Sequence, residues 1–393
     1  MDEPSRILIV DDEPLNLDYL EQELEDLGYE VLSARNGQEA LEFVEAEAPD
    51  MILLDIMMPM MDGFEVLSRL KAEQHWRDIP VVVISALSDM DNVVKGIELG
   101  AEDYLPKPFD PILLQARIRA GLEKKRLRDL ERLYLKALER ELEIGREIQA
   151  DFLPDEIPQP EGWEIATYFK AAREVAGDFY DVFRLPEGRV GLIVGDVCDK
   201  GVGAALYMAL FRSLLRITSN MPAYTNSPEH RGVENDRVSV LKNSIELTNR
   251  YICDVHRSAM FASLFFGVLD PGSALLSYVN AGLEPPLILR HGKMLSELMP
   301  TSPVVGCIEE MDFDVGETRL EPDDLLLLYT DGVTDAQNAN GEAFERERIL
   351  SLVEEQTTSA VSLLNHIVSN VQAFIGETPQ FDDITLMAIQ RKG

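Results

Sequence analysis

The chain has 393 residues, of which 46% are hydrophobic, and a formal net charge of −35 at pH 7. This length predicts more than one domain, and the hydrophobic fraction is sufficient for ordinary globular cores. The strongly acidic balance argues against nonspecific binding to nucleic acid or to an anionic membrane, because both require basic surfaces.

Cysteine usage and the start of the chain indicate the compartment. Cys198, Cys253 and Cys307 are far apart and odd in number, which favours a reducing environment over a disulfide framework or a zinc site. The first residues lack the pattern of a signal peptide, and no apolar run approaches the length of a membrane span. We therefore expect a soluble, cytoplasmic protein that binds neither nucleic acid nor a membrane.

The first predicted domain, residues 1–121, alternates between apolar runs and amphipathic stretches. Five runs are typical of buried parallel strands: residues 7–10, 30–33, 51–54, 81–84 and 103–105. Amphipathic stretches such as residues 15–27 and 36–45 lie between them. This alternation predicts an α/β domain of the flavodoxin-like type, with a five-stranded parallel sheet and helices on both faces.

Charged side chains follow three of these strands. Asp11 and Asp12 come directly after the first strand, Asp55 follows the third, and Lys107 follows the fifth. The carboxyl ends of parallel strands form the edge where ligands bind. Asp11 and Asp12 would hold a hard divalent cation. Asp55 would be an oxygen nucleophile that accepts a phosphoryl group, and Lys107 would place a positive charge on the phosphoryl oxygens.

Residues 6–121 resemble the receiver domain of bacterial two-component response regulators. The matching positions are Asp11-Asp12, Asp55 within Leu-Leu-Asp-Ile-Met-Met-Pro, Asp62-Gly63, Ser85-Ala86, and Tyr104 ahead of Lys107-Pro108. The resemblance implies that a sensor histidine kinase or a phosphotransfer protein phosphorylates Asp55 with Mg²⁺ bound. It also implies that the Met57 carbonyl completes the Mg²⁺ shell, that Ser85 hydrogen-bonds the phosphoryl group, and that Tyr104 changes rotamer on phosphorylation.

A structural reading of the same positions is the alternative. A single Asp or Ser after a strand is usually a helix cap or a turn residue. Five matching positions in family order at strand ends make that reading a poor one for the whole set. The Lys107-Pro108 peptide bond is expected to be cis, as in the family, because proline lowers the cost of that isomer.

Residues 122–154 are rich in Leu, Glu, Arg and Lys and predict a long helical connector. Two adjacent stripes keep 3- and 4-residue steps: Leu127, Leu130, Tyr134, Ala137, Glu141, Ile144 and Ile148, and Leu135, Leu138, Leu142, Gly145, Gln149 and Phe152. Together they are wider than one packed surface requires, which favours a homodimeric coiled coil through residues 122–153. A single helix packed on its own domains is the alternative. Glu141 and Gly145 are weak points of the seam, where a bend is expected.

The last predicted domain, residues 155–393, has clustered strands. Strands are predicted at residues 163–169, 190–197, 261–269, 275–281, 287–290, 324–330 and 384–389, and helices at 202–218, 238–255, 346–354 and 360–375. This grouping predicts an α+β layered fold. Residues 219–237, which are polar and contain two prolines, are predicted to form a long surface loop.

Four acidic motifs occur in this domain. They are Gly177-Asp178-Phe179-Tyr180-Asp181, Gly195-Asp196-Val197, Tyr329-Thr330-Asp331-Gly332 and Phe381-Asp382-Asp383-Ile384-Thr385. Each places an Asp at the edge of an apolar run or a turn, often beside a glycine that lets the backbone approach closely. Convergent Asp side chains without His or Cys select Mg²⁺ or Mn²⁺ over zinc. Two such ions can share a water, lower its pKa and clamp a phosphoryl oxygen, which suggests hydrolysis of a phosphate monoester.

These motifs, in this order, resemble the SpoIIE-like branch of the metal-dependent PPM serine/threonine phosphatases over residues 143–391. The resemblance implies an alpha-beta-beta-alpha sandwich with two Mn²⁺ or Mg²⁺ ions. Carried over position by position, the metal ligands are Asp178, Asp196, Asp331 and Asp382. The resemblance adds the backbone carbonyl of Val197 as a ligand, and Asp383 is the alternative ligand at the last motif.

The sequence departs from the SpoIIE-like pattern after Asp196. Cys198-Asp199-Lys200-Gly201-Val202-Gly203-Ala204-Ala205 stands where many relatives have Ser-Gly-His-Gly-Val-Pro-Ala-Ala. The glycine and alanine framework remains, so the close turn from strand to helix is expected to remain. Lys200 in place of His changes the charge near the site.

The sequence thus predicts a response regulator whose effector is a metal-dependent protein serine/threonine phosphatase. Resemblance suggests a phosphorylated anti-sigma-factor antagonist of the STAS type as substrate, in bacterial stress signalling. The alternative is a catalytically weak adaptor that binds a sigma factor or other regulator under receiver control, which predicts eroded metal ligands; all four aspartates are present. A transcription factor is disfavoured by the acidic charge and by the absence of a basic helix-turn-helix pattern.

Overall fold

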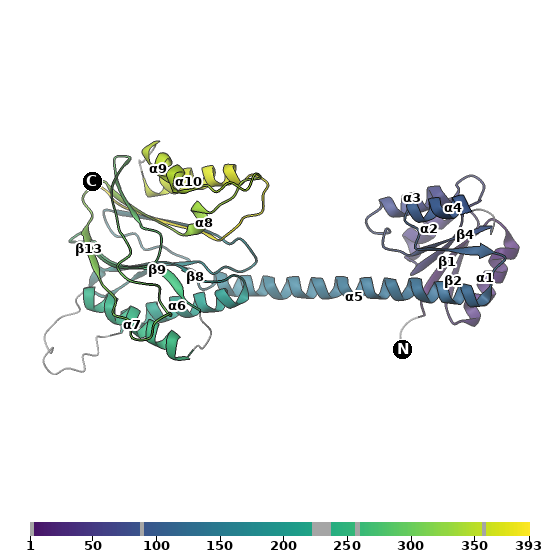
Figure 1. The fold of residues 1–393 in the computed structure, drawn as a ribbon, viewed down its shortest axis with the longest axis horizontal. Coiled ribbons are helices and arrows are strands. Elements are labelled where there is room, and N and C mark those ends of the chain that lie inside the picture. The colour runs from purple at the N-terminus through teal and green to yellow at the C-terminus, as the bar shows by residue number, and fades with distance from the viewer. Residues whose placement is uncertain (1–3, 87–89, 222–236, 256–259, 356–358) are drawn as a thin grey trace. The chain divides into compact units, whose positions relative to one another are not determined.

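The computed structural model describes residues 4–86, 90–221, 237–255, 260–355 and 359–393. The chain divides into two compact units, Met1–Leu138 and Glu139–Gly393, and Figure 1 labels their helices and several of their strands. No helix in the described part of the chain is long and apolar enough to cross a membrane.

The first unit contains a parallel sheet with the strand order β2-β1-β3-β4-β5. Its elements are β1 (Arg6–Val10), α1 (Pro14–Asp26), β2 (Glu30–Ala34), α2 (Gly37–Glu47), β3 (Met51–Asp55), α3 (Gly63–Ala72), β4 (Val81–Ala86), α4 (Met90–Glu98) and β5 (Asp103–Lys107). This is the flavodoxin-like strand order, so the predicted receiver fold is confirmed.

Both faces of this sheet are covered by helices. On one face α2 and α3 bury Val44 and Leu67 against the strands. On the other face α1 and the start of α5 bury Leu20 and Ile118. Every residue of β3 is buried, which explains why its sequence is a continuous apolar run instead of an alternating one.

Helix α5 (Pro111–Ala150) is 40 residues long and continuous. It begins at Pro111 instead of the predicted residue 122, because the last helix of the receiver fold and the connector are one helix. Gly145 continues the helix, and a Cβ built there would lie 3.6 Å from Val175 Cγ1. Several apolar side chains of the predicted seam are largely exposed, including Leu130 (62%) and Tyr134 (69%).

The second unit contains two antiparallel sheets, β13-β10-β9-β8-β7 and β12-β11-β14-β15-β6. The strands are β6 (Trp163–Lys170), β7 (Phe179–Arg184), β8 (Val190–Val197), β9 (Ala262–Asp270), β10 (Leu275–Ala281), β11 (Leu287–Arg290), β12 (Lys293–Glu297), β13 (Gly316–Arg319), β14 (Asp324–Tyr329) and β15 (Ile384–Arg391). The helices are α6 (Val202–Asn220), α7 (Arg237–Val255), α8 (Asp331–Thr334), α9 (Arg346–Glu355) and α10 (Ala360–Ile375).

Three apolar clusters fill the spaces between the layers of this unit and hold the layers together. Phe265 and Leu326 lie in the cluster between the two sheets. Their chain neighbours point the other way: Phe266 packs with α6 and α7, and Leu327 packs with α9 and α10. Figure 1 shows α6 and α7 on one side of the sheets and α8, α9 and α10 on the other. The unit is therefore an α-β-β-α sandwich, as predicted.

Three strands were not predicted. In β7, Asp181 interrupts the apolar pattern of the strand. Its side chain is nevertheless fully buried, since Arg212 and Arg216 pair with it. β12 is mostly exposed, and β13 has only four residues. Of the predicted loop over residues 219–237, α6 includes the first two residues and α7 begins at the last one; residues 222–236 lie outside the described residues.

Candidate active sites

The carboxyl edge of the first sheet brings together the acidic residues predicted there. Carboxylate oxygens of Asp11, Asp12 and Asp55 all lie within 4.8 Å of one another. Asp11 and Asp55 are buried, whereas Asp12 is exposed. Lys107 Nζ lies 2.9 Å from Asp11 Oδ2 and 2.8 Å from Asp55 Oδ2. Three carboxylates this close suit a hard divalent cation, and the ammonium group compensates part of their charge.

The ion pair with Lys107 opposes the effect of burial on Asp55. Burial raises the pKa of Asp55, and the hydrogen bond and charge of Lys107 lower it again in part. Burial alone would lower the pKa of Lys107, but its hydrogen bonds to Asp55 and Asp11 outweigh burial and raise that pKa. Lys107 is therefore charged at neutral pH, and its charge favours the ionised form of the Asp55 carboxyl.

The motif Asp62-Gly63 positions the loop that follows Asp55. A Cβ on Gly63 would lie 2.3 Å from the backbone oxygen of Asp55, so no side chain fits there. Asp62 caps α3 by accepting a hydrogen bond from the Glu65 backbone at 2.8 Å. In this loop the Met57 N–H donates to Asp55 Oδ1 at 3.4 Å, so the Met57 backbone lies beside the Asp55 carboxylate.

Ser85 and Tyr104 lie on the two neighbouring strands. Ser85 Oγ is buried and has no hydrogen-bond partner among the residues that the structure describes. Because a buried hydroxyl without a partner is costly, a phosphoryl oxygen near Asp55 would satisfy it. The Tyr104 ring lies 5.9 Å from the Arg117 guanidinium. The Lys107-Pro108 bond is cis, as expected.

Asn16 is a site residue that sequence reasoning missed. Its amide donates to both oxygens of Asp11 at 3.0 and 3.1 Å and to Glu13 at 3.1 Å. The Glu13 N–H also donates to Asp11 Oδ1 at 2.9 Å. These bonds fix the orientation of Asp11. An Asn in the first turn of a helix is common, so nothing local distinguished it.

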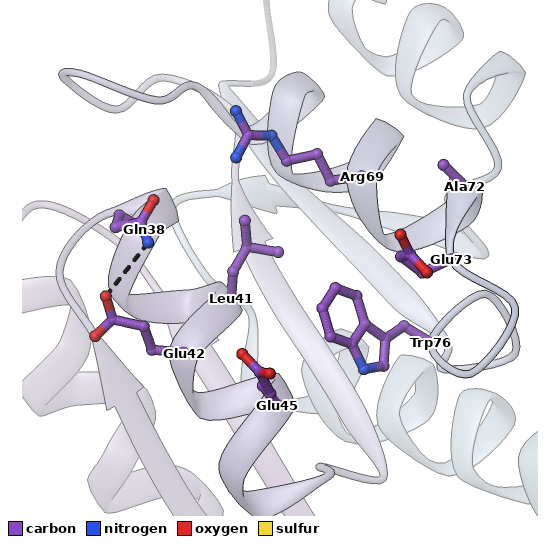
Figure 2. A pocket seen from close by; sticks show the side chains of 8 residues that line it. All are labelled: Gln38, Leu41, Glu42, Glu45, Arg69, Ala72, Glu73 and Trp76. Carbon is purple, nitrogen blue, oxygen red and sulfur yellow. Dashed lines mark hydrogen bonds between the residues drawn. The ribbon is translucent and has the colours of Figure 1, made fainter.

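A groove of about 300 Å³ lies elsewhere on the receiver, between α2 and α3. Figure 2 shows Trp76 on one wall, with Glu42 and Glu45 on α2 and Glu73 near it. Gln38 donates to Glu42 at 3.3 Å. None of the eight lining residues belongs to the phosphoacceptor set, so we do not assign this groove to the phosphorylation chemistry.

The second unit collects the four acidic motifs where its two sheets meet. Asp178 precedes β7 and Asp196 lies near the end of β8, both in one sheet. Asp331 begins α8 directly after β14, and Asp382 precedes β15, both in the other sheet. Each carboxylate therefore stands at the end of a buried strand, and the two sheets contribute two each.

Two glycines allow these strand ends to approach. A Cβ on Gly332 would lie 1.8 Å from the backbone oxygen of Asp383. A Cβ on Gly177 would lie 2.9 Å from the backbone oxygen of Val197. A side chain at either position would push the motifs apart, which explains why both positions are glycine. The Val197 carbonyl predicted as a ligand thus faces the loop that carries Asp178.

Threonine hydroxyls join the two sheets at Asp178. Thr330 Oγ1 donates to Asp178 Oδ2 at 2.7 Å, and Thr385 Oγ1 donates to the same oxygen at 2.6 Å. All three side chains are buried. Sequence reasoning included both threonines in the motifs but gave them no role. Thr330 directly precedes Asp331, and Thr385 lies two residues after Asp383; this proximity in sequence was the available signal.

Asp382 and Asp383 have different surroundings. Asp383 accepts hydrogen bonds from the backbone N–H groups of Ala172 at 2.7 Å and Gly177 at 2.8 Å, one on each oxygen. Its carboxylate therefore holds the loop that leads to Asp178. Asp382 is partly exposed, and its Oδ2 lies 2.7 Å from Lys200 Nζ. The positive charge that Lys200 brings in place of His therefore lies directly against one predicted metal ligand, Asp382.

The carboxylates raise one another's pKa values. Burial raises the pKa of Asp196 to about 7, with added repulsion from Asp331 and Asp382. Burial and the charge of Asp196 also raise the pKa of Asp178, and burial and Asp382 raise that of Asp331. Such a cluster gains from a bound cation, and ligands that are all carboxylates suit Mg²⁺ or Mn²⁺. In the receiver, carboxylate oxygens of three acids all lie within 4.8 Å of one another. Among the described residues of the second unit, no three acids lie that close together, so its carboxylates are spaced more widely.

Comparison with known proteins agrees with both units. The family model of stage II sporulation protein E (SpoIIE) matches residues 186–392, and that of the response regulator receiver domain matches residues 7–119. The chain belongs to the SpoIIE family, and its first unit is a receiver domain. The SiaA-PP2C domain of Pseudomonas aeruginosa has a similar fold, with a TM-score of 0.52 and 23% identity, over 65% of this chain and 98% of that one.

Two curated relatives match different parts of the chain. Protein IcfG of Synechocystis sp. is 41% identical over 263 residues, which cover 64% of this chain and 41% of IcfG. The response regulator PleD of Caulobacter vibrioides is 47% identical over 116 residues, which cover 30% of this chain and 26% of PleD. The chain thus spans less than half the length of either relative.

Proposed function

We propose that this chain is a response regulator whose effector is a metal-dependent protein serine/threonine phosphatase. The observation that carries this proposal is the cluster of acids at the ends of four buried strands, in which burial, with added repulsion from Asp331 and Asp382, raises the Asp196 pKa to about 7. An acidic cluster without a compensating cation is unfavourable, and divalent cations supply that charge. Membership of the SpoIIE family supports the same reaction.

The proposed metal ligands are Asp178, Asp196, Asp331 and Asp382, with the Val197 carbonyl. When bound there, Mn²⁺ or Mg²⁺ would lower the pKa of a water and neutralise phosphoryl oxygens. The chain's own residues prepare the ligands: Thr330 and Thr385 orient Asp178. We assign Asp383 to positioning, because both of its oxygens accept backbone hydrogen bonds.

The receiver would control this site through Asp55. We propose that a sensor histidine kinase or phosphotransfer protein donates the phosphoryl group, so that a P–N bond of phosphohistidine breaks as a bond from Asp55 Oδ to phosphorus forms. Asp11, Asp12, Asp55 and the Met57 carbonyl would hold Mg²⁺. Lys107 and Ser85 would hold phosphoryl oxygens, and Tyr104 would respond by a rotamer change.

The end of α5 offers a route for control. Gln149 Nε2 donates to the Ala176 carbonyl at 2.7 Å, and the Ala176 N–H donates to Gln149 Oε1 at 2.9 Å. This buried pair of bonds lies two residues before Asp178. Phosphorylation would shift a population between two arrangements of this helix, and the shift would reach Asp178 through Ala176.

We also propose that the chain is a homodimer through residues 122–153. The supporting observation is the exposed apolar seam of α5 with its 3- and 4-residue steps. The proposed functional division is a receiver at residues 1–121, a connector at 122–154 and a phosphatase at 155–393. Light scattering at micromolar concentration, with and without phosphorylation, tests the dimer; a monomer in both states would contradict it.

The proposed substrate is a phosphorylated STAS-type anti-sigma-factor antagonist, which rests on family resemblance. The test of the reaction is hydrolysis of a generic phosphomonoester, with Mn²⁺ and with a chelator, by the parent and Asp331→Asn. We expect activity only in the parent with Mn²⁺. Silence on this compound and on a phosphorylated STAS protein would contradict the phosphatase and favour the adaptor.

A further inference from the structure

Lys200 occupies the turn between β8 and α6, beside the proposed metal cluster. Its Nζ lies 2.7 Å from Asp382 Oδ2 and donates to the Phe381 carbonyl at 3.0 Å. The same ammonium lies 4.7 Å from the centre of the Phe381 ring. All three contacts are to two consecutive residues, so they hold the positive charge of Lys200 directly against Asp382.

The local structure does not itself favour a lysine here. Lys200 precedes Gly201, the N-cap of the 19-residue helix α6, and the positive end of a helix dipole repels a cation. Asp199 and Gly201, on either side of Lys200, both have positive φ, 75° and 85°. This turn of the backbone therefore fixes the position of the Lys200 Cα. The attraction of Asp382 offsets the repulsion from the helix end.

We propose that Lys200 is an internal cation that competes with the metal for Asp382, so that the phosphatase domain binds metal more weakly than its carboxylates alone would. This inference rests on the proposed function. Lys200 and Asp382 are 34% and 27% exposed, so the ammonium can move into water when a metal enters. Lys200 therefore tunes metal affinity and does not block the site.

A direct metal-binding measurement on the full chain tests this competition. The receiver binds divalent cations too, so its site is first silenced with Asp12→Asn and Asp55→Asn in every protein compared. Binding of Mn²⁺ alone is then followed by the loss of the free-ion paramagnetic resonance signal. Lys200→Met is expected to bind Mn²⁺ on the order of fivefold more tightly than the parent.

Two further variants separate competition from other effects. Lys200→Arg keeps a cation beside Asp382 and is expected to keep the affinity of the parent. Lys293→Met removes an exposed lysine of β12 in the same domain and is expected to leave the affinity unchanged. A fivefold gain in Lys293→Met as well would mean a general charge effect and would overturn the competition.

The result also separates this inference from the proposed function. Equal Mn²⁺ affinity of the parent and Lys200→Met, with binding intact, overturns the competition and leaves the metal site standing. Absence of Mn²⁺ binding in all of these chains overturns both. Tighter binding in Lys200→Met alone, with Lys200→Arg like the parent, supports both.

Discussion

Both sites gather carboxylates at the ends of buried strands, but they compensate the charge differently. In the receiver one lysine, Lys107, lies within 2.9 Å of two buried carboxylates. In the sandwich, hydroxyl groups of Thr330 and Thr385 bind the deepest carboxylate, and Lys200 reaches only the partly exposed Asp382. In the receiver, a side chain of the chain itself therefore compensates the buried carboxylates, whereas in the sandwich we propose that an added cation does so.

The largest effect expected from this comparison is that loss of phosphatase turnover leaves phosphorylation of Asp55 intact. Asp331→Asn should lower phosphatase turnover on the order of 100-fold or more, because a proposed metal ligand is lost. The same variant should still be phosphorylated at Asp55 by a small phosphodonor, detected by phosphate-affinity electrophoresis. Asp335→Asn, which removes an exposed neighbouring carboxylate, is the matched control and should retain turnover. Loss of Asp55 phosphorylation in Asp331→Asn would contradict this expectation.

The two lysines should differ in their effect on stability. Lys107→Met should lower the free energy of unfolding of the receiver by about 2 kcal/mol, because Asp11 and Asp55 lose a shared partner. Lys200→Met should change the unfolding of the sandwich by less than about 1 kcal/mol, because its ion pair is partly exposed. Urea unfolding of the metal-free full chain measures both. Similar losses in the two variants would contradict the contrast.

Gln149→Ala should weaken the connection between the two regions. It removes two buried hydrogen bonds to Ala176 and should cost about 2 kcal/mol of stability in the sandwich. The change in turnover on Asp55 phosphorylation should become smaller while Asp55 phosphorylation itself is unchanged. An exposed change on the same helix, Glu139→Ala, is the control. An undiminished response in Gln149→Ala would remove the proposed route.

Thr330→Val is expected to have a smaller, local effect. The substitution keeps the shape of the side chain and removes two hydrogen bonds of the Thr330 hydroxyl, the one it donates to Asp178 and the one it accepts from the Thr385 N–H at 3.1 Å. This loss should cost about 1–2 kcal/mol and weaken Mn²⁺ binding on the order of tenfold. Thermal unfolding and the Mn²⁺ titration give the two values. Unchanged Mn²⁺ affinity would mean that Thr330 does not orient Asp178.

The sandwich should also show a pH dependence that a metal removes. Burial raises the Asp196 pKa from 3.8 to about 7, so the folded, metal-free state binds more protons than the unfolded state between these values. Stability from this group is full below the unfolded pKa and is lost as pH rises to about 7. With a chelator, the unfolding temperature should therefore fall over this range, and Asp196→Asn should flatten the curve. Saturating Mn²⁺ should oppose the fall.

Sequence patterns gave the two folds and the order of the acidic motifs, because continuous apolar runs and strand ends are local signals. They did not give the start of α5, since a receiver's last helix and a following connector have the same composition. They also missed β7, where the charge of Asp181 is buried only because Arg212 and Arg216, distant in sequence, pair with it. Long-range partners of this kind have no local signal.

The choice between neighbouring acids illustrates the same limit. Asp382 and Asp383 are adjacent in the sequence, and only their contacts in the structure distinguish them: Asp383 accepts from the backbone N–H groups of Ala172 and Gly177, whereas Asp382 pairs with Lys200. Asn16 is likewise ordinary until it binds Asp11. Motifs therefore predicted both candidate sites, whereas the residues that orient the predicted ligands required the three-dimensional contacts.

The most direct test of the account is the rate of Mn²⁺-dependent hydrolysis of a phosphoserine substrate, measured with and without a small phosphodonor, in the parent and in Asp55→Asn. The account predicts that both proteins hydrolyse the substrate only with Mn²⁺, and that the phosphodonor changes the rate of the parent alone. Equal rates with and without the phosphodonor in the parent, despite complete phosphorylation of Asp55, would contradict control of the phosphatase by the receiver.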